Sequence, residues 1–346
     1  MPGDHHAMQA AVLYGPGDLR VETVPRPAIV APDEALIRIR ACGICPSDLR
    51  AYSGVRKPPR DFPYTPGHEW AGEIVALGEA AAGLAVGDRV VPSWRVVCGW
   101  CYYCLRGLHN YCENLARGRV RGGFAEYGVA PVASLLKIPP AVTYPEAAFC
   151  EPLACCINGS RWSQIALGAD VAILGAGPIG LLHLQLAKCS GARVIVSDLL
   201  PERLQKAEEL GADALVNAAQ EDPVAREQAL TGGRGAEVVI VAVGAPQAAQ
   251  QALEMAGLGA TVNLFAGTYP PATVPLDPNL IHYRQIRLTG SHDYSPLDFQ
   301  NALRSIELGL VRVAPLLSHV LPLAQVREGF DLVAGQKGLK VCIRMD

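Results

Sequence analysis

The chain has 346 residues, of which half are apolar and 18% are charged, a composition typical of folded chains and not of disordered ones. Its 30 Lys and Arg residues and 33 Asp and Glu residues give a net charge of −3, so we expect no nucleic acid and no anionic membrane surface as a partner. The longest apolar run covers residues 238–243, whereas a membrane span needs about 20 residues.

The many cysteines of this chain need an explanation other than disulfide bonds. The first residues lack the basic and apolar segments of a signal peptide, so we expect a cytoplasmic protein whose cysteines stay reduced. The chain has 11 cysteines, and an odd number also argues against a closed set of disulfides.

Short apolar runs broken by glycine and proline fill residues 1 to about 150. They include LIRIR, EIVALG, DRVVPS and GFAEYGVA. This pattern is typical of the many short strands of a barrel or sandwich. We therefore expect a mainly-β domain in this part of the chain.

From about residue 155 to 290, apolar strands alternate with helical patterns. The strand VAILGAG precedes the helix PIGLLHLQLAKCSG, RVIVSD precedes PERLQKAEELGAD, and EVVIVAV and ATVNLFA flank PQAAQQALEMAGL. This alternation predicts a doubly wound parallel sheet with helices on its faces. Two helix patterns and a closing strand, LKVCIRM, follow in the last part of the chain.

A glycine-rich turn joins the first strand and helix of that second region. It has the GxGxxG pattern of a dinucleotide-binding loop, with Gly175 for the tight turn, Gly177 for close approach of a pyrophosphate, and Gly180 for helix packing. The free N–H groups at the start of the helix favour phosphate. The residues expected to bind the cofactor here are Gly175, Gly177, Pro178, Ile179 and Gly180. A generic tight turn is the alternative.

The next strand ends at Asp198, which is placed to accept hydrogen bonds from the adenosine ribose. A carboxylate there repels a 2′-phosphate, so NAD is favoured over NADP. Arg203 weakens this preference, because an arginine nearby could accommodate the phosphate.

Four cysteines fall within one short segment, and their spacing is that of a zinc site. The pattern is C-x2-C-x2-C-x7-C, and four thiolates match a closed tetrahedral zinc site with a structural role. An iron–sulfur cluster is the alternative metal group, and a nucleic-acid-binding zinc module, which would need a basic surface, is the alternative function. The four cysteines are Cys98, Cys101, Cys104 and Cys112.

A second set of candidate ligands is spread along the chain. Cys45, the pair His68 and Glu69, and Glu151 offer thiolate, imidazole and carboxylate groups, and a catalytic zinc takes three protein ligands and keeps one position open. The spacing alone is moderate evidence, because a His–Glu pair is more often an ordinary surface or core pair.

Together these motifs resemble the zinc-dependent medium-chain alcohol dehydrogenase family over the whole chain. The matching segments, in order, are CGICPSD, TPGHEWAGEIVALG, the four-cysteine segment, GGFAEY, EPLACCING, VAILGAGPIG and VIVSD. The Glu-Pro-Leu stretch at Glu151 resembles the polyol branch, such as the sorbitol (L-iditol) dehydrogenases, and also the threonine dehydrogenases. Ordinary alcohol dehydrogenases usually carry Cys at this position.

The resemblance implies an α/β fold with two domains. Residues 1–152 and 292–346 would form a mainly-β GroES-like catalytic domain, with the structural zinc lobe at 95–115, and residues 153–291 a Rossmann dinucleotide-binding domain. It also implies two zinc ions per chain, NAD as cofactor, and a homo-oligomer, either a tetramer or a dimer.

The resemblance further implies a role for each residue of the catalytic site. Cys45 and His68 become zinc ligands, and Glu69 and Glu151 share the remaining coordination, either of them binding directly. Asp48 would orient His68, and Ser47 would take the substrate proton. Many relatives carry His at the position of Arg50, which cannot act as a base. Lys340 lies where relatives often carry a cation for the cofactor phosphate.

Three functional hypotheses follow. The first is an NAD-dependent dehydrogenase of a polyol, sugar alcohol or cyclitol. The second keeps the chemistry but has L-threonine or a simple secondary alcohol or diol as substrate. The third is a zinc- and nucleotide-binding scaffold without turnover. A family resemblance supports the reaction type better than the substrate.

Overall fold

The computed structural model describes residues 7–55, 61–115, 119–268 and 270–345. The chain divides into two compact units, one made of Met1–Pro152 and Ser295–Asp346 and the other of Leu153–Tyr294. The sequence analysis places the first junction at the same residue and the second junction slightly earlier, before residue 292. None of the helices in the described residues is long and apolar enough to cross a membrane.

The second unit is built on a six-stranded parallel sheet in the order β10-β9-β8-β11-β12-β13. The inner strands are apolar on both faces and are almost completely buried, as expected for a sheet covered on both sides. The strands are β8 (Asp170–Leu174), β9 (Arg193–Asp198), β10 (Ala214–Asn217), β11 (Ala236–Val241), β12 (Ala256–Leu264) and β13 (Arg287–Gly290).

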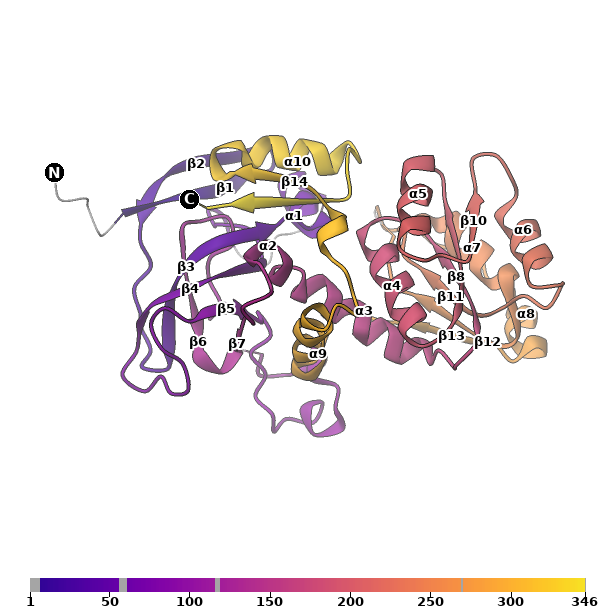
Figure 1. Ribbon diagram of the computed structural model, residues 1–346, viewed down its shortest axis with the longest axis horizontal. Coiled ribbons are helices and arrows are strands. Elements are labelled where there is room, and N and C mark those ends of the chain that lie inside the picture. Colours follow the sequence, from indigo (N-terminus) through magenta and orange to yellow (C-terminus); the bar gives the residue numbers. More distant parts are fainter. Residues whose placement is uncertain (1–6, 56–60, 116–118, 269, 346) are drawn as a thin grey trace. The chain divides into compact units, whose positions relative to one another are not determined.

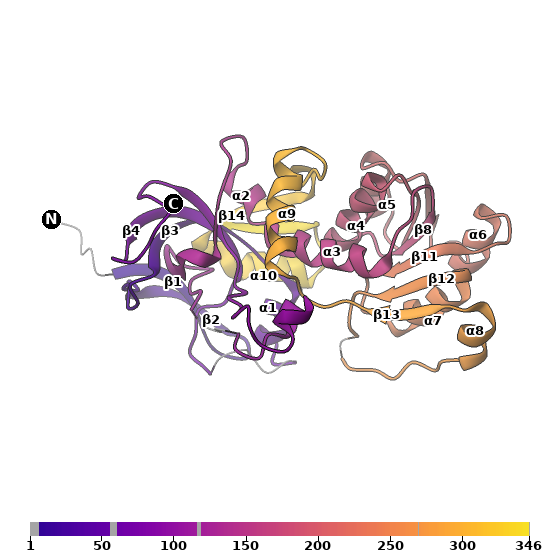
Figure 2. The same ribbon diagram turned by 90° about the horizontal axis from the view of Figure 1, so that it is seen from below.

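Helices cover both faces of this sheet. Figure 2 shows α4 and α5 on one face and α7 and α8 on the other. Several of them begin with proline, whose fixed φ suits a first helical turn. The helices are α4 (Pro178–Cys189), α5 (Pro201–Glu209), α6 (Pro223–Leu230), α7 (Pro246–Met255) and α8 (Pro278–Arg284). The predicted Rossmann sheet is confirmed, and its strand order reverses between β8 and β11, where such sheets bind ligands.

The first unit is mainly β, as predicted. Figure 1 shows its strands, which form a seven-stranded sheet in the order β14-β15-β3-β4-β5-β7, with β6 paired to β3, and a separate β1-β2 hairpin. The strands are β1 (Ala7–Gly15), β2 (Asp18–Pro25), β3 (Glu34–Gly43), β4 (Glu69–Leu77), β5 (Arg89–Pro92), β6 (Tyr127–Pro131), β7 (Leu135–Lys137), β14 (Leu317–Pro322) and β15 (Lys340–Arg344).

Short helices pack around this sheet. Apolar side chains of β3, β4, β15 and α10 form one continuous core. The helices are α1 (Pro46–Tyr52), α2 (Tyr144–Ala147), α9 (Pro296–Glu307) and α10 (Val326–Ala334), and α3 (Cys150–Ser163) begins in this unit and continues into the second.

The second unit holds a buried acid in α6. Glu227 in α6 is 1% exposed, and neither of its carboxylate oxygens has a hydrogen-bond partner among the described residues. Burial raises the pKa of Glu227 to about 7, and the Asp170 carboxylate acts in the same direction. The protonated form therefore favours the fold, and ionisation opposes it.

We predict that Glu227→Gln raises the melting temperature at pH 8 and leaves it unchanged at pH 5. The raised pKa means that the stability supplied by the protonated acid is complete below about pH 4.5 and is lost as the pH rises through about 7, a loss of roughly 3 kcal/mol. Thermal melts from pH 5 to 8 measure this, with the exposed Glu208→Gln as the matched control. A pH-independent difference between Glu227→Gln and the parent would contradict the prediction.

Candidate functional site

Strand register brings the scattered metal-ligand candidates together. Gly43 at the end of β3 lies opposite Glu69 at the start of β4. Cys45 follows β3 by two residues and His68 immediately precedes β4, so antiparallel pairing puts them at the same place. The ligand atoms of Cys45, His68 and Glu69 lie within 4.8 Å of one another. We call these three residues the catalytic group.

Asp48 holds two members of this group. It is the third residue of α1, and its Oδ2 accepts a hydrogen bond from the Cys45 N–H at 3.0 Å, while its Oδ1 lies 3.4 Å from Nδ1 of His68. Burial acts to lower the pKa of His68, but the Asp48 carboxylate and Cys45 together raise it to well above its ordinary value. A ligand role requires the neutral ring, so metal binding here must displace that proton.

Glu69 is paired with a buried lysine. The Nζ of Lys340 forms an ion pair with Oε2 of Glu69 and donates to the Ile44 carbonyl at 3.1 Å. Both side chains are nearly inaccessible. Burial lowers the pKa of Lys340, but the Glu69 carboxylate raises it by more, so the ammonium stays charged.

Gly43 is the residue that leaves room for this pair. A Cβ on Gly43 would overlap the Glu69 carboxylate and lie 2.8 Å from Cε of Lys340. Strand β15, which begins at Lys340, pairs with β3 on the side opposite β4. The ion pair therefore bridges two strands across the end of a third. The Glu69 partner of Lys340 was not predicted from the sequence, and the expectation that Lys340 also faces a cofactor phosphate stays a prediction.

Glu151 lies near the catalytic group but outside it. It begins α3, is 8% exposed, and its Oε1 accepts a hydrogen bond from the Trp94 indole at 3.1 Å. Burial raises the pKa of Glu151, the His68 ring lowers it and the Glu69 carboxylate raises it. Among the described residues, the candidate ligand atoms that lie within 4.8 Å of one another belong to Cys45, His68 and Glu69, and not to Glu151.

The donor set of the catalytic group fits a zinc ion. Thiolate, imidazole and carboxylate are the three ligand types found at catalytic zinc sites. The carboxylates of Glu69, Glu151 and Asp48 face two cationic partners, Lys340 and the protonated His68 ring. A divalent cation that displaces the His68 proton replaces its positive charge, and Asp48 keeps its contact with the ring, as the carboxylate partners of zinc-binding histidines usually do.

The four cysteines form a second group in a lobe after β5. Their sulfur atoms lie within 4.8 Å of one another, and the Sγ atoms of Cys98 and Cys104 are 4.0 Å apart. Sulfurs bound tetrahedrally at the usual zinc–sulfur distance are about 3.8 Å apart. The lobe has two short 3₁₀ turns, η1 (Cys104–Arg106) and η2 (His109–Tyr111), so the thiol group is its main source of order.

Hydrogen bonds prepare these thiols for a cation. The Cys98 N–H donates to Sγ of Cys112 at 3.3 Å, and the Asn114 amide donates to Sγ of Cys98 at 3.6 Å. Burial acts to raise the pKa of Cys98, but donors from Trp100 and Asn114 lower it to about 6. Burial raises the pKa of Cys104 to about 12, so four thiolates are compatible only with a bound metal. The lobe therefore fits a structural zinc ion.

The glycine loop has the geometry that a dinucleotide requires. Gly175 has a φ of +102°, and a Cβ on Gly180 would overlap the Gly175 carbonyl, so both are needed for the turn itself. A Cβ on Gly177 would meet only Nη1 of Arg203, 4.0 Å away. The fold does not need glycine at Gly177, and the space above it fits a pyrophosphate at the start of α4, whose first turn holds Pro178 and Ile179.

Asp198 closes the loop from the neighbouring strand. Its Oδ2 accepts from the Ala176 N–H at 2.6 Å, and its Oδ1 accepts from the Leu200 N–H at 3.0 Å. Arg203 lies with Nη1 3.9 Å from Oδ2 of Asp198. The structure thus brings together all the residues predicted for cofactor binding.

Two residues discussed from the sequence lie on α1, and two residues near the catalytic group were not predicted there. Ser47 and Arg50 are half-buried, one in the first turn of α1 and the other in its last turn. The unpredicted residues are Trp94, with no local sequence signal, and Lys340 as the partner of Glu69. A lysine within the apolar strand KVCIR is a signal of a buried acidic partner that sequence reasoning could have used.

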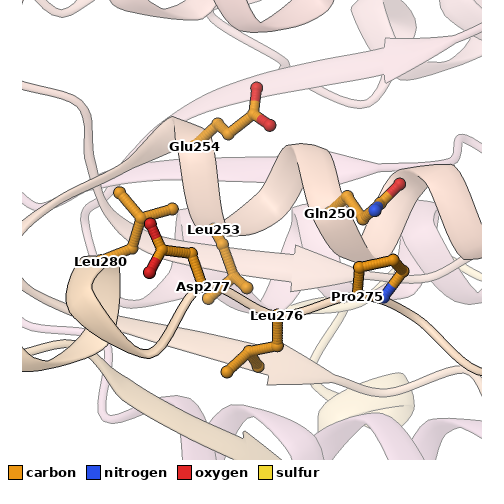
Figure 3. Close-up of a pocket in the computed structure, with 7 residues that line it drawn as sticks. All are labelled: Gln250, Leu253, Glu254, Pro275, Leu276, Asp277 and Leu280. Atoms are coloured by element: carbon orange, nitrogen blue, oxygen red, sulfur yellow. The ribbon is translucent and has the colours of Figure 1, made fainter.

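A cavity in the second unit is lined by residues that were not predicted to form a site. It has a volume of about 330 Å³ and is lined by residues of α7, of α8 and of the segment that leads into α8, which Figure 3 draws as sticks. Its acids are Glu254 and Asp277, and Asp277 caps α8 by accepting from the Asn279 N–H at 2.8 Å. It contains none of the predicted site residues.

Comparison with known proteins supports the same assignment in both units. Residues 31–140 match the alcohol dehydrogenase GroES-like domain and residues 178–307 match the zinc-binding dehydrogenase family. The chain is 37% identical to the erythritol/L-threitol dehydrogenase of Mycolicibacterium smegmatis, covering 97% of each chain. It is 34% identical to the L-threonine 3-dehydrogenase of Pyrococcus horikoshii, covering 95% of this chain and 94% of that protein.

A solved structure agrees with the fold. A protein of Sinorhizobium meliloti 1021, described as a zinc-binding dehydrogenase and solved with NADP, superposes with a TM-score of 0.90 at 33% identity, covering 98% of this chain and 99% of that one. The predicted family is confirmed. The chain belongs to the zinc-containing medium-chain alcohol dehydrogenases, and it is a zinc-dependent NAD(P) dehydrogenase of CH–OH donors.

Proposed function

We propose that this chain transfers a hydride between a secondary alcohol of a polyol, sugar alcohol or cyclitol and NAD. The observation that supports a polyol as substrate is the carboxylate of Glu151 beside the catalytic group. Ordinary alcohol dehydrogenases have a thiol at this position. The relative that acts on erythritol and L-threitol, which are polyols, supports the same class.

Each residue of the site then has a task. Cys45, His68 and Glu69 would hold the zinc ion, with Glu151 beside them as the carboxylate that can exchange with Glu69. The ion, when bound, supplies a Lewis acid that polarises the reacting oxygen. Asp48 fixes the tautomer and orientation of the His68 ring through Nδ1. Lys340 holds one oxygen of Glu69 in place.

Ser47 is the proposed acceptor of the substrate hydroxyl proton. It lies half-buried in the first turn of α1, two residues after the ligand Cys45. A hydroxyl can accept one proton while it donates its own, so Ser47 passes the proton on. Arg50 cannot continue this relay as a base, and we assign it to an anionic group of the cofactor or the substrate.

NAD is the proposed cofactor, and it would accept the hydride. The Asp198 carboxylate faces the loop where the adenosine ribose lies in such folds, and it repels a 2′-phosphate. Arg203, with Nη1 3.9 Å from Asp198, weakens this repulsion. The relative from Sinorhizobium meliloti was solved with NADP. We therefore expect a measurable activity with NADP that is lower than the activity with NAD.

L-threonine is the second candidate substrate. The L-threonine 3-dehydrogenase relative covers the chain almost as completely as the polyol relative does. The scaffold hypothesis is disfavoured because Cys45, His68 and Glu69 are brought together. The homo-oligomer, as tetramer or dimer, and the cytoplasmic location stay predictions.

We predict NADH formation with a polyol in a panel of sorbitol, xylitol, erythritol, L-threitol, inositols, L-threonine, 2,3-butanediol and a simple secondary alcohol. Cys45→Ser should lower kcat/KM by more than 1,000-fold, because removing a metal ligand removes most transition-state stabilisation. Its circular dichroism should match the parent. The exposed Cys189→Ser is the control. A preference for L-threonine would overturn the substrate class, and full activity of Cys45→Ser would overturn the mechanism.

We also predict that Gly177→Ala folds normally but loses cofactor binding. The added methyl group meets no backbone atom within 4 Å, yet it would occupy the space assigned to the pyrophosphate. NADH fluorescence titration should show a dissociation constant at least 10-fold higher, with an unchanged melting temperature. Unchanged NADH affinity in Gly177→Ala would show that the dinucleotide does not approach the loop at this residue.

A further inference from the structure

Glu151 is held by a side chain outside the catalytic group. The Trp94 indole N–H donates to Oε1 of Glu151 at 3.1 Å. Trp94 lies two residues after β5, which ends at Pro92, and it is half-buried. A buried carboxylate with a fixed donor on one oxygen has one preferred orientation, so the position of the indole sets the position of this carboxylate.

Trp94 is in turn fixed by its neighbour. The guanidinium carbon of Arg95 lies 4.3 Å from the centre of the Trp94 ring, which is the distance of a cation–π contact. Arg95 is only 6% exposed, and a buried guanidinium needs partners for its donors. A guanidinium held over the indole restricts the positions that the ring can take.

The other end of Arg95 reaches the four-cysteine lobe. Its Nη1 donates to the Asn110 carbonyl at 3.0 Å. Asn110 belongs to η2, and Cys112 follows it by two residues, with Sγ accepting from the Cys98 N–H. Arg95 is therefore bonded to the part of the lobe that leads directly into one of its four cysteines.

We propose that Arg95 and Trp94 are positioning residues that couple the four-cysteine lobe to the catalytic group. The lobe, once ordered by its metal, holds Arg95, Arg95 holds the Trp94 ring, and Trp94 orients the Glu151 carboxylate beside Cys45, His68 and Glu69. Any effect of this coupling on turnover rests on the proposed function. Its effect on metal binding is independent of the proposed function, because metal binding involves only residues of the first unit.

The test measures Co²⁺ binding at the catalytic group by its visible spectrum in the full chain, with zinc retained in the lobe and with no substrate or cofactor. Trp94→Phe keeps the stacking ring but removes the N–H donor, and Arg95→Leu removes the link to Asn110. Each should raise the Co²⁺ dissociation constant about 10-fold, the lower end of the effect of losing a second-shell contact. Trp100→Phe, on the exposed surface of the lobe, is the matched control and should leave it unchanged.

If Trp94 and Arg95 act through one chain of contacts, the effects of the two substitutions on the Co²⁺ dissociation constant should not add. The double variant Trp94→Phe/Arg95→Leu should bind Co²⁺ no more weakly than either single variant, because both break one chain of contacts. Cys101→Ser, which removes the lobe metal, should weaken binding at the catalytic group to the same extent. If Cys101→Ser does not fold, Arg95→Leu tests the same link.

An unchanged Co²⁺ dissociation constant in Trp94→Phe would overturn the proposal, as would additive effects in the double variant. If Arg95→Leu does not fold, Trp94→Phe decides alone. Failure of the proposed function gives a different result, since the metal measurements would still follow this pattern while none of the alcohols is oxidised. The proposal and the activity are therefore tested separately.

Discussion

The buried ion pair between Glu69 and Lys340 is the interaction on which the catalytic site depends. It joins the first residues of β4 and β15 across the last residue of β3, where only glycine leaves room for it. A charged pair withdrawn from water costs desolvation energy, which a hydrophobic pair would avoid. Its presence at this point of the sheet is explained by the need for a carboxylate of fixed position next to Cys45 and His68.

The two metal-ligand groups arise in different physical ways. The four thiols come from one short loop, so their approach costs little chain entropy, and the lobe has few other contacts to order it. The catalytic group is assembled by strand pairing, with Cys45 and His68 placed by the register of β3 and β4. Loss of the lobe metal should therefore loosen a loop and, through Arg95 and Trp94, the Glu151 carboxylate. Cys45, His68 and Glu69 themselves remain in place as long as the sheet does.

Local motifs were predictable from the residues themselves, whereas the approach of Cys45 to His68 and Glu69 was expected only from the family resemblance. The glycine loop, Asp198 and the four cysteines each lie within a short stretch, and the structure brings each set together as predicted. Glu69 and Glu151 could not be distinguished from the sequence, because the difference depends on Lys340, far along the chain, and on the Trp94 indole. The Glu69 partner of Lys340 was not predictable because it is fixed by the β15–β3 register, which a single sequence does not reveal.

The central claim is that this chain holds two zinc ions in groups of different composition. The most direct measurement is a crystal structure of the protein as purified, with anomalous difference maps on either side of the zinc absorption edge. The account predicts two peaks per chain, one among the sulfurs of Cys98, Cys101, Cys104 and Cys112 and one bounded by Cys45, His68 and Glu69. A single peak in the lobe, with crystals grown in the presence of zinc, would contradict it.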